Sequence, residues 1–148
     1  MISHSYDLEI KKFWPDIKVS GVACPFWVPL VEYNEADSPG ADYFVKKRID
    51  ELMRKDNDID TIILGCTHYP ILMPKIIKYV KPGVRIIPQG EYIADSLKTY
   101  LDRHDTIESQ ITHGGSCRYY TTENPDKFKE SAQIFLHEKV TVNHVDLE

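Results

Sequence analysis

TIILGCTHYPIL, residues 61–72, changes character at its central glycine. The residues before the glycine are mostly apolar, which is typical of a buried strand in a parallel sheet. A thiol, a hydroxyl and an imidazole then follow in Cys66, Thr67 and His68, and Pro70 suits the first turn of a helix. This order predicts a strand, a loop with reactive groups and a helix. Ligands of open α/β sheets bind at such strand ends, so the loop is the first candidate site.

The rest of the chain alternates between helical and strand patterns. Helices are expected over residues 3–14, 38–55, 70–80, 90–104 and 124–137, and strands over 17–23, 60–64, 84–87, 117–121 and 140–145. We expect an apolar loop over 25–32 and a polar linker over 105–115. Trp14, Phe26 and Trp27 are expected in the core. The alternation predicts an α/β fold with a largely parallel sheet and flanking helices.

Composition narrows the function classes. The chain has 148 residues and a formal net charge of -5, with 18 Lys+Arg against 23 Asp+Glu, which disfavours nucleic acid as a partner. Its three cysteines contain no CxxC spacing, so neither a disulfide framework nor a structural zinc site is expected. Reduced thiols fit a cytoplasmic protein. No apolar run is long enough to cross a bilayer, so we expect no membrane association.

The chemistry of the loop leaves several roles open. At a strand end before a helix, a cysteine tends toward its thiolate form, so Cys66 could be a nucleophile, a metal ligand or a general base. Thr67 could hold a carboxylate, and His68 could position or protonate a nearby group. Each of these residues alone is more often a core residue or a surface residue without a function. Their combination favours a functional site. Glu32 could orient an imidazole, as carboxylates do in catalytic triads, or could simply be exposed.

The segment LGCTHYP, residues 64–70, resembles the glutamate racemases of the aspartate/glutamate racemase superfamily. Further similar segments are ACP at 23–25, VPLVE at 28–32, PQGE at 88–91 and YYTTENPDKFKESAQIFL at 119–136. The resemblance therefore covers almost the whole chain. Gln89 departs from the family's usual Asp-Pro/Ser-Gly-Glu stretch. His68 favours glutamate as the substrate, because the aspartate racemases typically carry Glu at that position.

The resemblance implies an enzyme that interconverts L- and D-glutamate without a cofactor. Two cysteines on opposite faces of the substrate exchange its α-proton, and by this resemblance Cys66 is one of them. His68 assists its proton transfer, Glu32 pairs with that histidine, and Thr67 helps to hold the substrate. The partner is a small molecule, glutamate, and the D-glutamate formed supplies peptidoglycan synthesis.

The resemblance also implies a domain organisation. The family has two similar α/β domains with the active site between them. Residues 1–92 would form most of the second domain, and residues 93–148 a return segment that normally completes the first. The first catalytic cysteine is expected to be missing, since neither Cys24 nor Cys117 has its setting. We therefore expect a C-terminal portion without full racemase activity alone, whose apolar surface makes it a homo-oligomer. Two alternatives are a non-catalytic amino-acid-binding or assembly module and another cofactor-free racemase.

Overall fold

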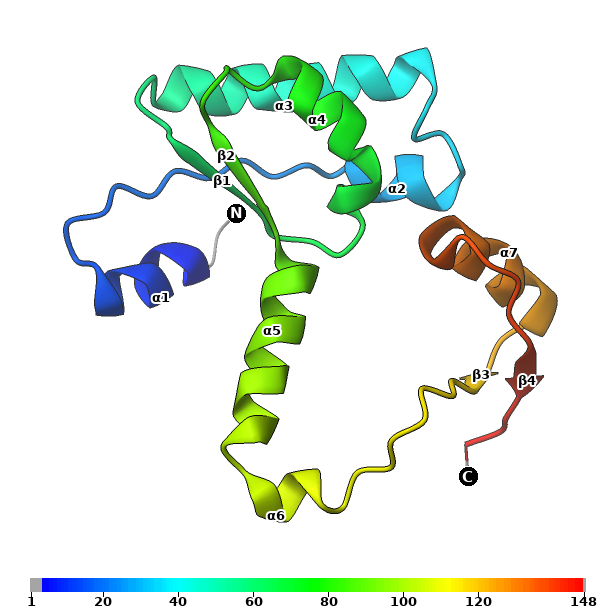
Figure 1. Cartoon of the computed structure of the whole chain (residues 1–148). Coiled ribbons are helices and arrows are strands. Elements are labelled where there is room, and N and C mark those ends of the chain that lie inside the picture. The colour runs from blue at the N-terminus through cyan, green and yellow to red at the C-terminus, as the bar shows by residue number, and fades with distance from the viewer. Residues whose placement is uncertain (1–3, 148) are drawn as a thin grey trace. The chain divides into compact units, whose positions relative to one another are not determined.

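The computed structural model describes residues 4–147 and divides the chain into two compact units after Gly90 (Figure 1). The first unit contains α1 (Ser5–Phe13), α2 (Trp27–Glu32), α3 (Pro39–Lys55), β1 (Thr61–Leu64), the 3-10 helix η1 (Tyr69–Leu72), α4 (Met73–Tyr79) and β2 (Arg85–Pro88). Helix α5 (Gln89–Asp102) begins at its end, and the second unit continues with α6 (Asp105–Glu108), β3 (Tyr119–Thr121), α7 (Pro125–Leu136) and β4 (Val142–His144). Helices alternate with strands in both units, which confirms the predicted α/β class.

The described residues contain two separate two-stranded sheets, both parallel, rather than one larger sheet. In the first, Ile62 lies opposite Ile86 and Leu64 lies opposite Pro88. The two strands therefore end at the same level. The residues that follow them, Gly65 and Gln89, begin the connections at the carboxyl edge of this sheet.

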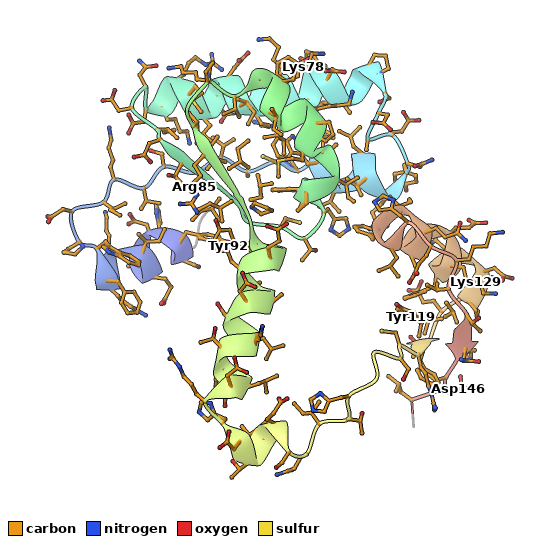
Figure 2. All side chains as sticks on the ribbon, viewed as in Figure 1. Lys78, Arg85, Tyr92, Tyr119, Lys129 and Asp146 are labelled. Atoms are coloured by element: carbon orange, nitrogen blue, oxygen red, sulfur yellow. The ribbon has the colours of Figure 1, made fainter. Side chains whose placement is uncertain are left out.

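Helix α3 supplies much of the core of the first unit. It begins at Pro39, where the Ser38 side chain accepts a hydrogen bond from the backbone N–H of Ala41 at 3.2 Å. One face of the helix is buried, and its buried residues recur every four positions: Ala41, Val45, Ile49 and Met53. Figure 1 shows α3 and α4 lying side by side on the β1–β2 sheet, and side chains fill the space between these layers (Figure 2).

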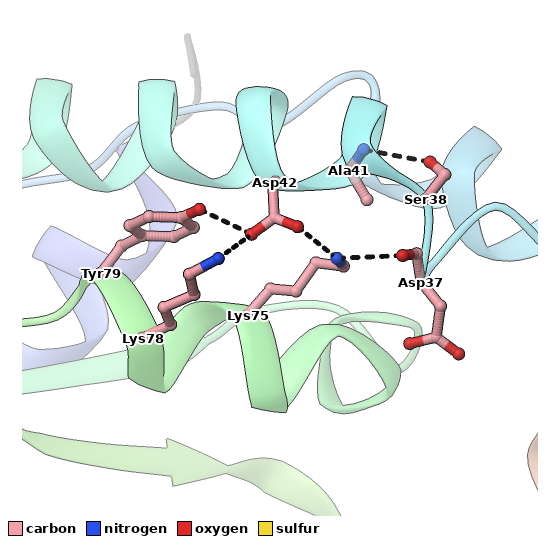
Figure 3. A network of polar contacts seen from close by, with 7 residues as sticks. All are labelled: Asp37, Ser38, Ala41, Asp42, Lys75, Lys78 and Tyr79. Atoms are coloured by element: carbon pink, nitrogen blue, oxygen red, sulfur yellow. Dashed lines mark hydrogen bonds and ion pairs between the residues drawn. The ribbon is translucent and has the colours of Figure 1, made fainter.

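A polar network also joins α3 to α4 (Figure 3). Asp42 of α3 accepts hydrogen bonds from Lys75 Nζ at 2.6 Å, from Lys78 Nζ at 2.8 Å and from the Tyr79 hydroxyl at 2.5 Å. Lys75 Nζ also donates to the backbone carbonyl of Asp37, at 3.2 Å. Lys75 lies one turn before Lys78 and Tyr79 in α4, so one carboxylate fixes this helix along α3.

Residues 17–23 do not form the strand that the sequence predicts. A strand needs a ladder of backbone hydrogen bonds to a neighbour. Here the carbonyl of Gly21 instead accepts from Lys55 Nζ at 2.8 Å, and Lys18 forms an ion pair with Asp56 at 2.8 Å. Side chains at the end of α3 therefore hold this segment in place of a sheet.

The prediction of an apolar loop over residues 25–32 is also wrong, because this segment contains α2. Pro29 is the third residue of this helix, where its missing N–H would have had no partner inside the helix. Trp27 and Val31 are buried, whereas Phe26 is 51% and Trp14 is 59% exposed, so only one of the three aromatic residues expected in the core lies there.

The second unit is a βαβ arrangement in which α7 packs on β3 and β4. Asn124 caps α7 by accepting hydrogen bonds from the backbone N–H groups of Asp126 and Lys127, and Pro125 occupies the first turn. Val142 of β4 is buried. The assignment of this region as a return segment of a larger domain stays a prediction.

Candidate active site

The candidate site occupies the loop between β1 and η1 in the first unit. Cys66 and His68 are half-buried and Thr67 is exposed. The backbone N–H of Tyr69 donates to the carbonyl of Cys66 at 3.2 Å, and that of Ile71 donates to the carbonyl of His68 at 3.1 Å. These bonds turn the chain tightly after the strand. The sequence predicts a longer helix here, but a 3-10 helix of four residues separates the loop from α4.

The imidazole of His68 lies close to the other three candidate residues, Glu32, Cys66 and Thr67. Its Nδ1 lies 3.8 Å from Cys66 Sγ and 3.4 Å from Thr67 Oγ1. Its Nε2 lies 2.5 Å from Glu32 Oε1. Glu32 is the last residue of α2, so helix formation over the PFWVPLVE segment brings this carboxylate to the loop, 36 residues away in the sequence.

These partners determine which nitrogen of His68 carries the proton. The Glu32 carboxylate can only accept, so Nε2 carries the hydrogen and donates to it. In the neutral imidazole, Nδ1 is then an acceptor facing the thiol of Cys66 and the hydroxyl of Thr67. The arrangement of thiol, imidazole and carboxylate follows the logic of a triad, in which an oriented base withdraws a proton from a nucleophilic group.

Tyr69, which has no role predicted from the sequence, links this loop to a second cysteine. Its ring meets that of Trp27 edge-on, with centroids 4.8 Å apart. Its hydroxyl hydrogen-bonds with the Cys24 side chain, and burial raises the pKa of Tyr69 to about 12, with the neighbouring side chains of Cys24 and Cys66 adding to the effect. Burial also raises the pKa of Cys24 to about 11, so this thiol stays protonated at neutral pH. Position next to His68 was the only sequence signal for Tyr69.

Tyr6 also reaches the end of the sheet, and nothing in the sequence indicates this contact. Its hydroxyl lies over Gly65, and a Cβ added there would approach it to 2.8 Å. The same hydroxyl accepts a hydrogen bond from Gln89 Nε2 at 3.0 Å. A residue of α1 thus contacts the carboxyl ends of β1 and β2 together, although 59 and 83 residues separate it from these positions in the sequence.

The described part of the chain contains no group of three or more His, Cys, Asp and Glu side chains that could hold a metal ion. None of its helices combines the length and the apolar character that a bilayer crossing requires.

Comparison with known proteins identifies the relatives of this chain. Curated glutamate racemases from Streptococcus pyogenes serotype M5 (strain Manfredo) and serotype M2 (strain MGAS10270) are each 37% identical to it over 145 residues. The alignment covers 98% of this chain and 54% of each relative. The chain is homologous to the glutamate racemases. It spans about half the length of the curated relatives it matches. No protein-family model matches it.

Solved structures of glutamate racemases share the fold. An isoform from Bacillus anthracis superposes with a TM-score of 0.82 at 30% identity, covering 96% of this chain and 52% of that one. The Francisella tularensis glutamate racemase in complex with D-glutamate gives a TM-score of 0.80 at 26% identity, with 97% and 53% covered. The Thermus thermophilus glutamate racemase in complex with β-chloro-D-alanine gives 0.73 at 26% identity, with 95% and 53% covered.

Proposed function

We propose that this chain carries one half of a glutamate racemase active site, with Cys66 as one of its two bases. The observation that carries the proposal is the line of thiol, imidazole and carboxylate at the end of β1, in a chain homologous to glutamate racemases. In relatives of about double length, a second base would come from the part that this chain does not match.

In the proposed reaction the Cys66 thiolate removes the α-proton of glutamate. The S–H bond forms as the Cα–H bond breaks, and its electron pair stays on the substrate as a carbanion. His68, held by Glu32, exchanges a proton with the thiol through Nδ1. Thr67 donates to the α-carboxylate and so disperses the developing negative charge.

Racemisation needs a second acid on the opposite face of the carbanion, because one base returns the proton to the face from which it came. Cys24 is unsuited to act as a thiolate at neutral pH, since burial raises its pKa to about 11. We therefore propose that this chain alone exchanges the α-proton without inverting the substrate. The complete reaction needs no cofactor and supplies D-glutamate for peptidoglycan in the cytoplasm.

A second candidate is a non-catalytic amino-acid-binding or assembly module. The observation that favours it is the coverage of the relatives, of which the chain spans about half. Cys66→Ala would leave ligand binding by such a module nearly intact, whereas an enzyme would lose its proton transfer. Another cofactor-free racemase of the superfamily would show itself in a panel of amino-acid substrates.

The test is α-proton exchange of L- and D-glutamate in D2O, followed by proton NMR. We expect the signal of the α-proton to fall without formation of the other enantiomer, and we expect Cys66→Ala to abolish the exchange. Full racemisation by a pure sample of this chain would contradict the single-base mechanism. Absence of exchange with both enantiomers would contradict catalysis by the half-site and leave the binding module.

A further inference from the structure

The end of the β1–β2 sheet holds a polar contact that the proposed chemistry does not use. Tyr6 of α1 places its hydroxyl over Gly65, the residue that immediately precedes Cys66. Gln89, the first residue of α5, donates its side-chain N–H to the same hydroxyl at 3.0 Å. Because Leu64 and Pro88 lie opposite each other, this hydroxyl spans the ends of two paired strands.

The contact depends on the missing side chain of Gly65. An added Cβ would lie 2.8 Å from the Tyr6 oxygen and 3.2 Å from the ring carbon that bears it. The backbone of Gly65 does not have the positive φ that favours glycine, so close approach of the phenol is its main constraint. Gly90, two residues beyond the end of β2, has open space at the corresponding position. Close packing against Tyr6 therefore requires a glycine at position 65 but not at position 90.

We propose that Tyr6 and Gln89 are positioning residues for Cys66. Their hydrogen bond connects the end of β1 to the end of β2. The phenol of Tyr6 packs on the backbone of Gly65, where the Cys66 loop starts. A hydroxyl oxygen that accepts from Gln89 keeps its own hydrogen for donation toward the loop or its ligand. The inference rests on the proposed function, since the property being positioned is proton transfer by Cys66.

Four variants of the full chain test the inference: Tyr6→Phe, Gln89→Leu, Gly65→Ala and the double variant Gly65→Ala/Tyr6→Phe. Tyr6→Phe removes only the hydroxyl, and Gly65→Ala displaces it by contact. We expect each single change to slow α-proton exchange roughly 3- to 10-fold, mainly in the maximal rate rather than in the glutamate concentration at half-maximal rate. The double variant should be no slower than Tyr6→Phe, because both changes remove the same contact.

Controls separate this effect from a loss of folding. Tyr120→Phe removes an exposed phenol of the second unit, and Gly90→Ala adds a methyl group into open space. Both should exchange at the unmodified rate. The thermal midpoints of the positioning variants should match that of the unmodified chain. Exchange at the unmodified rate in Tyr6→Phe, Gln89→Leu and Gly65→Ala would overturn the inference.

A second readout keeps this test independent of the proposed function. If the unmodified chain exchanges no α-proton, the proposed catalysis fails, and alkylation of Cys66 by iodoacetamide decides the inference. Mass spectrometry of the digested chain resolves Cys66 from Cys24 and Cys117. A change of roughly threefold or more at Cys66 in Tyr6→Phe and Gly65→Ala, with Cys117 unchanged, supports the positioning role. Equal rates at Cys66 in all variants overturn it.

Discussion

At the scale of the residue, two half-buried cysteines lie near one phenol and differ in their partners. Cys66 faces the imidazole of His68 at 3.8 Å, which gives its proton an acceptor. Cys24 has the Tyr69 hydroxyl as a partner and lies 3.8 Å from the carbonyl of Val22, and burial dominates its pKa. These environments are why the proposed function assigns proton transfer to Cys66, whereas burial keeps the Cys24 thiol protonated at neutral pH.

The raised pKa of Cys24 predicts a loss of stability in alkaline solution. The native thiol titrates near pH 11, whereas in the unfolded chain it titrates near its ordinary value of 9.0. Between these values the unfolded state has released a proton that the native state still holds, so the free energy of unfolding falls as pH rises from about 9 to 11. Cys24→Ala should reduce this fall by about 1 kcal/mol, because the thiol keeps part of its contact with solvent.

Urea unfolding at pH 8 and at pH 11 measures this contribution. The matched control is Cys117→Ala, since Cys117 is exposed and its removal should change the fall with pH less than Cys24→Ala does. An equal fall in Cys24→Ala and in the unmodified chain would contradict the assignment.

At the scale of the element, the site depends on how α4 is held. The loop with Cys66 and His68 runs through η1 directly into α4, so the placement of this helix sets where the loop can lie. Burial of Leu72 at the end of η1 and of Ile76 in α4 holds the apolar side of this segment in the core. Asp42 anchors the polar side, and its three donors hold the pKa of its carboxyl far below its usual range.

We expect Asp42→Asn to lower the thermal midpoint by about 2–5 °C, since it removes a charge that two ammonium groups share. Asp50→Asn is the matched control on the same helix, because Asp50 is 47% exposed and pairs with Lys46 one turn away. The stability due to Asp42 is present at neutral pH and is lost as pH falls below about 4, where the unfolded carboxyl takes up its proton. Equal midpoints for the two variants at pH 7 would show that the network adds nothing to folding.

At the scale of the whole molecule, large apolar side chains remain on the surface. Helix α5 carries Ile93 at 61%, Leu97 at 55% and Tyr100 at 47% exposure, spaced so that they share one side of the helix. Phe13 and Trp14 are exposed at the end of α1. Exposed apolar stripes of this kind mark surfaces that associate. We propose that the chain associates with copies of itself through such surfaces.

Light scattering tests this proposal, with a mass well above 17.2 kDa expected at high concentration. Ile93→Lys/Leu97→Lys should shift the mass toward that of the monomer, because it places two charges on the apolar stripe. Ala94→Lys/Thr99→Lys adds the same charge outside the stripe and should leave association unchanged. A strictly monomeric unmodified chain at high concentration would contradict self-association.

Local sequence determined most of the elements and the chemical character of the loop. Ser38-Pro39 and Asn124-Pro125 define helix starts because a capping side chain and a fixed φ act within a few residues. The apolar run before Gly65 defines β1 for the same local reason. Two segments with strong local patterns were nevertheless misread. Residues 17–23 have no strand partner in the described structure, and Pro29 of α2 falls where a helix tolerates a proline.

Only the tertiary structure decided which distant side chains complete the site. Glu32 reaches His68 because α2 ends beside the loop, and Tyr6 reaches Gly65 and Gln89 because α1 lies at the end of both strands. Neither periodicity nor helix caps in the sequence predict such contacts. Packing between elements determines them, whereas local propensity determines only the individual elements. The residues Cys66, Thr67 and His68 were readable from the sequence, because a reactive loop after a buried strand is a local feature. The environment that separates Cys66 from Cys24 was not, because burial is a property of the folded chain.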